Sequence, residues 1–194
     1  MERRRQADRS AAMQRRLVDA AIDLLLERGW AATTAVAVCE RAGCTRGALM
    51  HHFPSLSALF ARALESLYED LTDKPQSAAI GLVGVVDQMW AVTGDPRFKA
   101  VMEAWSAAGN DPELATEVGP AIARFAKVVS PSNAPARSAV ANPNAKAFVF
   151  MAREAMLGLA LGRATNGGKP LGHERVVIAR LRDEAARLDD EGRS

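Results

Sequence analysis

Residues 29–60 constrain the fold more than any other part of this chain. They read as two short helices joined by a tight turn, with Ala42, Gly43 and Cys44 at the turn and Thr45 as a capping residue for the second helix. A glycine just after one helix and a threonine just before the next are residues that such boundaries favour. The pattern predicts a helix-turn-helix, a unit that presents its second helix to the major groove of DNA.

Positive charge is concentrated near this stretch. The whole chain carries a formal net charge of only +2. Residues 1–60 hold nine arginines and six acidic residues, which gives +3 there and leaves the remainder slightly acidic. The asymmetry is modest, but its location agrees with a nucleic-acid partner for the N-terminal part.

Prolines, glycines and capping residues divide the chain into helices. Apolar residues at helical spacing predict a first helix that ends at Gly29. Thr34 is expected to cap the second helix, and Pro54 with Ser55 to open a fourth that ends before Pro75. Nowhere do β-branched or aromatic residues alternate with polar ones over the length of a strand. The chain is therefore predicted to be all-α.

Two Asp-Pro pairs mark later helix starts. Asp95-Pro96 and Asp111-Pro112 each place a capping residue before a proline at the first helical position. A break or kink is expected at Gly119-Pro120, and residues 130–143 have the composition of a loop. These signals predict helices over roughly 97–108, 112–129, 144–164 and 173–189.

The composition is that of a chain with a sizeable core. With 194 residues and 48% hydrophobic content, it can form one large domain or two small ones. It has no run of about 20 apolar residues, so no membrane partner is expected. Its arginine-rich opening lacks the apolar segment of a secretory signal. We expect a cytoplasmic protein.

The two cysteines, Cys39 and Cys44, are too few for a disulfide framework. A zinc site would need further ligands, and only His51 and His52 stand near them in the sequence. We interpret both cysteines as small apolar packing residues. No cofactor and no metal are expected.

The penultimate helix is apolar on two sides. One stripe contains Phe148, Met151, Ala155 and Leu159, and a second, on another side, contains Phe150, Leu157 and Leu161. A helix that is apolar on two sides needs two packing partners. We predict that the last two helices form a homodimer interface, as a four-helix bundle across a two-fold axis. The alternative is that both stripes are buried in one larger core. The predicted interface residues are Phe150, Leu157, Gly158, Leu161, Ile178, Leu181, Ala185 and Leu188.

An ordered set of residues between positions 17 and 59 is specific to one family: Ala21, Gly29, Thr34, Ala42, Gly43, Thr45, Gly47, Leu49, His52, Phe53 and Ser55. Through this set the chain resembles the tetracycline-repressor (TetR) family of bacterial transcription regulators. The resemblance implies an all-α fold of about nine helices. It divides the chain into a flexible basic arm (1–14), a helix-turn-helix DNA-binding domain (15–60) and a larger ligand-binding and dimerisation domain (61–194).

The resemblance also implies DNA contacts. Arg46 is expected to bond a guanine or a phosphate, with a solvated surface charge as the alternative, and Ala48 to contact a thymine methyl. Gly47 would permit close approach to the DNA backbone. The full predicted set is Arg3, Arg4, Arg5, Thr34, Thr45, Arg46, Gly47, Ala48, Met50 and His51.

Two positions depart from the family pattern. Met50 replaces a common tyrosine whose hydroxyl bonds a phosphate, and Leu56 replaces a common lysine. Both replacements weaken the interactions with phosphates that supply salt-dependent affinity. The arginine-rich start, Arg3 to Arg5, is the expected replacement, with a solubilising tail as the alternative.

The expected function is that of a regulator and not of an enzyme, because no catalytic or phosphate-cradling motif is present. A homodimer would bind a palindromic operator in double-stranded DNA as a repressor and release it when a small apolar or amphipathic effector binds. The alternative is a dimeric small-molecule-binding or interaction module with weakened DNA binding. Candidate pocket residues, each of which would equally suit an ordinary core, are Met89, Trp90, Phe98, Met102, Trp105, Phe125 and Met151.

Overall fold

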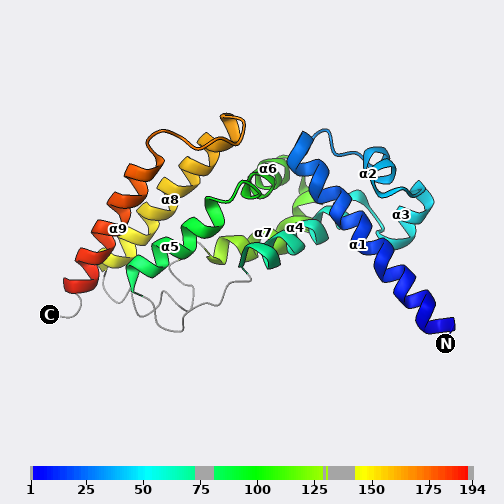
Figure 1. Ribbon diagram of the computed structural model, residues 1–194, viewed down its shortest axis with the longest axis horizontal. Coiled ribbons are helices and arrows are strands. Elements are labelled where there is room, and N and C mark those ends of the chain that lie inside the picture. Colours follow the sequence, from blue (N-terminus) through cyan, green and yellow to red (C-terminus); the bar gives the residue numbers. More distant parts are fainter. Residues whose placement is uncertain (1, 73–80, 129, 131–142, 192–194) are drawn as a thin grey trace. The chain divides into compact units, whose positions relative to one another are not determined.

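A computed structural model describes residues 2–72, 81–128, 130 and 143–191, and the side chains of residues 2–5 and 128 are excluded from the description. All regular structure in these ranges is helical (Figure 1), which confirms the predicted all-α class. No described helix is long and apolar enough to cross a membrane. The nine described helices are α1 (Glu2–Arg28), α2 (Ala35–Ala42), α3 (Arg46–His52), α4 (Leu56–Thr72), α5 (Leu82–Thr93), α6 (Phe98–Ala108), α7 (Pro112–Val128), α8 (Pro143–Thr165) and α9 (Glu174–Glu191).

The chain forms two compact units. The first unit consists of Met1–Asp70 and Ala100–Ala123, and the second of Leu71–Lys99 and Arg124–Ser194. The first therefore contains the helix-turn-helix, and the second contains α5, α8 and α9.

The core of the first unit is built on α1. Its buried face packs against α2 and α3, and Leu49 is the buried residue of α3. Apolar side chains spaced by three or four residues create this face, because they lie on one side of a helix. The buried residues of α1 are Leu17, Val18, Ala20, Ala21, Leu24 and Leu25.

Residues 2–14 differ from the flexible arm that was expected. They form the first turns of α1, which extend past α2 and α3 (Figure 1). Alanine, arginine, glutamine and glutamate favour helices, and the segment lacks proline and glycine. A basic segment that continues directly into a buried helix therefore has the local propensity to remain helical.

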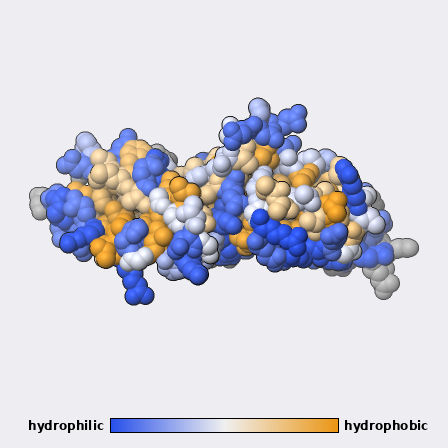
Figure 2. Space-filling view, turned by 90° about the horizontal axis from the view of Figure 1, so that it is seen from above, coloured by the Kyte–Doolittle hydropathy of each residue, from blue (hydrophilic) through white to orange (hydrophobic). Residues whose placement is uncertain are grey.

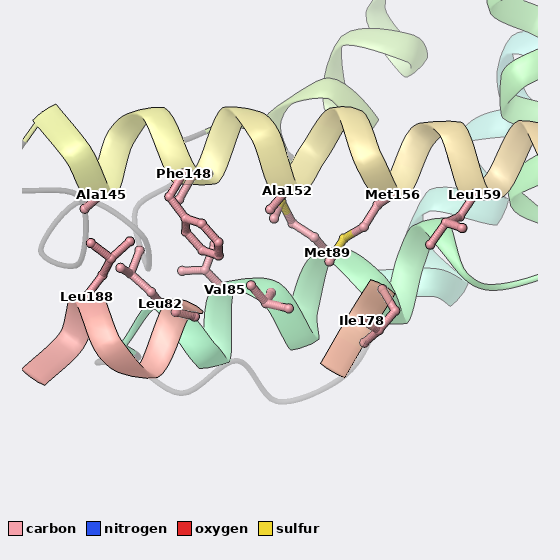
Figure 3. Close-up of a cluster of buried hydrophobic side chains, with 13 residues drawn as sticks. Leu82, Val85, Met89, Ala145, Phe148, Ala152, Met156, Leu159, Ile178 and Leu188 are labelled. Carbon is pink, nitrogen blue, oxygen red and sulfur yellow. The ribbon is translucent and has the colours of Figure 1, made fainter. Parts of the chain in front are cut away.

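The core of the second unit lies between α5, α8 and α9 (Figure 3). From α8, Phe148, Ala152 and Met156 point toward α5, where Met89 lies opposite Ala152 and Met156, and Ile178 of α9 belongs to the same cluster. All five are at most 4% exposed. At about 25 cal/mol per Å² of buried apolar surface, such side chains supply much of the stability of a domain.

The N-terminus of α5 is capped by a residue from α9. Gly81 at the capping position has no side chain to accept a hydrogen bond, so the backbone N–H of Leu82 donates to Oδ1 of Asp189 at 2.8 Å. A Cβ atom at position 81 would lie 2.3 Å from the Asp189 carboxylate. Glycine at this position thus makes room for a carboxylate that stabilises the helix N-terminus.

The predicted helix boundaries mostly agree with the structure. The break expected at Gly119-Pro120 is wrong, because α7 continues through Pro120. Proline removes one backbone donor, but Val118 and Ala121 on either side of it are buried, and this packing holds the helix together. Helix α5 has no counterpart among the predicted ranges, and most of the loop predicted at 130–143 lies outside the described residues.

Candidate nucleic-acid interface

The turn between α2 and α3 has the geometry that its sequence predicts. Gly43 adopts the left-handed conformation (φ 62°, ψ 47°), which glycine reaches without steric cost. Its N–H donates to the carbonyl of Glu40 at 3.2 Å, and the N–H of Cys44 donates to the carbonyl of Cys39 at 3.0 Å. This pair of bonds ends α2 and redirects the chain into α3.

Threonine hydroxyls cap both helices, as predicted. The hydroxyl of Thr34 accepts a hydrogen bond from the N–H of Ala37, and that of Thr45 accepts one from Ala48, each at 3.2 Å. Both threonines have extended backbone conformations, which is the usual geometry of an N-cap residue. The start of α3 is therefore fixed by residues adjacent to it in the sequence.

Side chains from α1 hold α2 in place. Arg41 of α2 pairs with Glu27 at 2.6 Å and with Asp23 at 3.6 Å. The hydrogen bond from Arg41 lowers the pKa of the Glu27 carboxyl below its ordinary value. The guanidinium of Arg16 donates to the carbonyl of Ala42, immediately before the turn. These contacts orient the second and third helices against the first.

Glu103 is a residue whose role the sequence did not reveal. Its carboxylate accepts a hydrogen bond from the backbone N–H of Trp30 at 2.6 Å. Trp30 follows the end of α1, and its ring lies 4.6 Å from that of Phe60, measured between centroids. Glu103 therefore ties α6 to the loop that precedes the helix-turn-helix.

Most residues predicted to contact DNA lie at the surface of the first unit. Thr34 and the α3 set are exposed, with Ala48 half-buried. Val36, which is 61% exposed near Thr34, extends this surface and was not among the predicted residues. The described side chains exclude Arg3, Arg4 and Arg5, so those three predictions lie outside the description. The exposed residues are Thr34, Thr45, Arg46, Gly47, Met50 and His51.

The predicted ligand-pocket residues are distributed over both units. Met102 and Trp105 belong to the first unit, and the other five belong to the second. Phe98 and Phe125 are core residues whose rings lie 6.0 Å apart, and Met151 is 62% exposed. Met151 lies outside the buried face of α8, which is formed by Ala145, Phe148, Val149, Ala152, Met156 and Leu159.

A cavity in the second unit includes one of these residues, Trp90. It has a volume of about 860 Å³. At the cavity, Arg163 lies over the Trp90 ring at 5.2 Å, pairs with the buried Glu174 and donates to the carbonyl of Gly94. These contacts fix Arg163 in position. The remaining residues around the cavity are Pro170, Leu171, Gly172, Arg175, Ile178 and Arg182.

Two of the additional cavity residues are arginines with different environments. Arg182 pairs with Asp87 at 2.7 Å. Arg175 is exposed, and the described residues give it no ion pair. Apolar contributions come from Leu171 and Ile178. The cavity therefore combines an aromatic ring and aliphatic side chains with an excess of positive charge.

The predicted dimer interface divides into two groups. Ile178, Ala185 and Leu188 of α9 are buried in the core of a single chain and are unavailable to a second copy, since α9 has one narrow apolar seam and it packs on α5 and α8. Leu181 is partly buried against the same cluster. The α8 residues Phe150, Gly158 and Leu161 are exposed, and Leu157 is half-buried.

Hydrophobic side chains therefore remain at the surface of the second unit. Figure 2 shows such patches between hydrophilic side chains over α8 and α9. Met151 and Leu161 of α8 are 62% and 55% exposed, and Val176 of α9 is 63% exposed. Arg153 lies over the Phe150 ring at 5.0 Å. Apolar residues gathered on one helix face are typical of an interaction surface.

Comparison with known proteins agrees with this architecture. Residues 17–63 match the model of bacterial regulatory proteins of the tetR family. The HTH-type transcriptional regulator CymR of Pseudomonas putida is 33% identical over 120 residues, which cover 58% of this chain and 59% of that protein. The alignment thus spans less than two thirds of that relative.

Solved structures share the fold at lower identity. A transcriptional regulator from Rhodococcus sp. Rha1 has a TM-score of 0.65 and 21% identity, over 90% of this chain and 95% of that one. FadR from Bacillus subtilis, in complex with stearoyl-CoA, has a TM-score of 0.59 and 12% identity, over 86% and 96% of the two chains. Residues 17–63 thus match the TetR family model, and most of the chain shares its fold with these regulators.

Proposed function

We propose that this protein regulates transcription as a homodimer that binds a palindromic operator through α3 and releases it when a small molecule binds. The observation that supports this most directly is the capped helix α3, whose outer face carries Arg46, Gly47 and His51 while Leu49 anchors it in the core. A short helix held in this way fits the major groove. Repression is the proposed sign of regulation.

Arg46 provides the first test. In a mobility-shift assay with the DNA upstream of the protein's own coding region, Arg46→Ala should weaken binding by about 1–3 kcal/mol if the guanidinium contacts a base. The matched control is Arg180→Ala on α9, an exposed arginine outside the proposed interface. Equal binding by both variants and the wild type would contradict the role of Arg46.

The N-terminal turns of α1 supply the second test. We propose that Arg3, Arg4 and Arg5 bind DNA phosphates and compensate for Met50 and Leu56. Deletion of residues 1–10 should then reduce the dependence of log affinity on log salt, by about 0.9 for each phosphate that these arginines neutralise in the wild type. An unchanged salt slope would show that these arginines bind no phosphates.

We propose the cavity beside Trp90 as the effector site, and an amphipathic anion as the effector class. The excess of arginine favours a carboxylate or phosphate, while Trp90, Leu171 and Ile178 offer contacts to an apolar body. This choice refines the expectation of an apolar or amphipathic molecule. The stearoyl-CoA bound by FadR has the same combination of charge and apolar surface.

Benzoate and its uncharged analogue benzamide can test this assignment. Benzoate should quench tryptophan fluorescence saturably and bind more tightly than benzamide, because only the carboxylate pairs with arginine. Arg175→Ala should weaken benzoate binding, whereas Arg180→Ala should not. Equal affinity for the two compounds, or no effect of Arg175→Ala, would argue against an anion site.

The exposed apolar face of α8 is our proposed dimer surface. Leu161→Glu places a charge at a position that is 55% exposed, so it should leave the monomer fold intact and prevent association. Sedimentation equilibrium should then show a dimer for the wild type and a monomer for the variant. A wild-type monomer at micromolar concentration would refute the proposal.

The alternative is a dimeric binding module with weakened DNA affinity. The two departures from the family pattern, Met50 and Leu56, favour it. Mapping bound DNA across the genome distinguishes the two functions. A dimer that binds benzoate but no DNA sequence specifically at low salt would establish the module and exclude the regulator.

A further inference from the structure

The two cysteines of the chain lie on either side of the turn that separates α2 from α3. Cys39 is within α2, and Cys44 directly precedes Thr45, the capping residue of α3. Both are free thiols, with Cys39 buried at 7% exposure and Cys44 half-buried. The more accessible thiol is therefore the one nearer to α3.

The backbone of the turn brings these two side chains together. The N–H of Cys44 donates to the carbonyl of Cys39, and the N–H of Gly43 donates to that of Glu40. Where a helix ends with this pair of bonds, the side chain of the residue after the glycine commonly contacts that of the residue five positions earlier. Here these two residues are Cys44 and Cys39. Burial raises the pKa of the Cys39 thiol, and its interaction with the adjacent Cys44 thiol raises it further.

We propose that Cys39 and Cys44 are a thiol-oxidation site that closes to a reversible disulfide across the turn. An apolar pair of other residues would fill the same space equally well, but two thiols in contact can also react with each other. The chain has no other cysteine, so neither thiol has a competing partner within the chain. A low-molecular-weight disulfide is the oxidant.

The reaction proceeds by two thiol–disulfide exchanges. The Cys44 thiolate attacks one sulfur of the small disulfide, which breaks its S–S bond and releases one thiolate that takes up a proton. The Cys39 thiol then loses its proton and attacks the Cys44 sulfur, which releases the second small thiol. Two protein thiols are oxidised by two electrons, and one small disulfide is reduced to two thiols.

Closure would displace the start of α3. A disulfide sets the two sulfur atoms about 2 Å apart, closer than two thiols in contact. Since Cys39 is packed in the core, the more accessible Cys44 must move, and Thr45 and Arg46 follow it directly in the chain. The chemistry is independent of DNA, whereas an effect on DNA affinity rests on the proposed function.

Oxidised glutathione is the probe for the chemistry. The folded protein is treated with it, denatured, alkylated with iodoacetamide and weighed by mass spectrometry. We expect a monomer that has lost two hydrogen atoms, carries no alkyl group and no glutathione, and returns to the dithiol form with dithiothreitol. Retained glutathione, or two alkylated thiols, would overturn the proposal.

Two matched variants locate the reacting atoms. Cys39→Ser should retain one glutathione on Cys44, because the second exchange cannot follow. Cys44→Ser should remain unmodified while folded, because its remaining thiol is buried. If the two variants retained glutathione equally, the order of attack given above would be wrong.

The regulatory effect has its own readout. Oxidation should weaken binding of the wild type to its upstream DNA by about tenfold, comparable to the removal of one side chain that reads a base, and Cys44→Ser should be insensitive. Unchanged affinity of a protein with the disulfide closed would refute the displacement of α3. A reduced protein that binds no DNA would instead refute the proposed function, and the mass measurement would still decide the disulfide.

Discussion

The helix-turn-helix and the α5–α8–α9 core are organised by contacts of different range. In the helix-turn-helix, Thr34 and Thr45 each bond an N–H three residues away. In the second unit, the N-terminus of α5 is capped by Asp189, 107 residues later, and the carbonyl of Gly94 accepts from Arg163, 69 residues later. The helix ends of the first region are thus set by short sequence motifs, whereas those of the second are stabilised by contacts between distant segments.

This difference predicts how much stability a single substitution removes in each region. A capping motif contributes on the order of 1 kcal/mol and acts on one helix end. A buried side chain between three helices contributes several times more, because its removal leaves a cavity among all of them. We therefore expect the largest losses of stability from the core of the second unit.

Phe148→Ala should have the largest effect. Phe148 is 2% exposed within the cluster of α5, α8 and α9, and truncation of such a residue costs about 3–5 kcal/mol of unfolding free energy. Urea denaturation measures this loss. Val36→Ala on α2 is the control, since its exposed side chain should change stability by less than about 0.5 kcal/mol. Equal losses in the two variants would remove the distinction between the two regions.

Asp189→Ala tests the long-range cap. Removal of the carboxylate leaves the N–H of Leu82 without its partner, which should cost about 1–2 kcal/mol. Asp183→Ala, on the exposed side of α9, is the control and should have little effect. If adding Gly81→Ser to the Asp189→Ala variant restored its stability, a local cap would be able to replace the distant one. The two regions would then differ only in how far along the chain the capping residue lies from the helix that it caps.

The sequence predicted the first region in detail for the same reason. Gly43, Thr34 and Thr45 act on residues next to them, so their roles follow from their positions in the chain. The family resemblance added the expectation that Arg46 and its neighbours face outward, and these residues are exposed. Local chemistry was sufficient for the caps and the turn, but not for the contact of Glu103 with Trp30, which lie 73 residues apart.

The second region required information that no short motif carries. Helix α5 begins at a glycine without a side-chain cap, and its stabilising carboxylate lies on α9. The apolar stripes of α8 were recognised, but the face that each residue occupies depends on where α5 and α9 pack. Met151 was therefore assigned to a pocket, although it is exposed. Ile178 was assigned to a dimer interface, although it is core.

Thr45→Ala sharpens the comparison at a smaller scale. The substitution removes the acceptor for the N–H of Ala48, and α3 has only seven residues, so loss of about 1 kcal/mol should fall mainly on this helix. Amide hydrogen exchange should accelerate in α3 and remain unchanged in α5. Thr45→Ser keeps the hydroxyl and should preserve protection. If exchange in α5 rose as much as in α3, the cap would be acting on the whole chain.

The smallest expected effect concerns ion pairs at the surface. Arg41 lowers the pKa of Glu27 across α1 and α2, and Arg187 lowers the pKa of Glu184 within α9. A carboxyl with a lowered pKa in the folded state stabilises the fold above its unfolded pKa, and this contribution is lost as the pH falls through the folded value.

Glu27→Gln should therefore lower the Tm slightly at neutral pH and have no effect in acid, where the wild-type carboxyl is protonated as well. The difference should also shrink with added salt, because both partners are exposed to solvent. Glu184→Gln is the matched control, because Glu184 pairs with Arg187 within a single helix. Since Glu27 joins two helices, its replacement should reduce protection of α2 against hydrogen exchange, whereas Glu184→Gln should affect α9 alone. A pH-independent effect of Glu27→Gln would show that its contribution comes from packing and not from the ion pair.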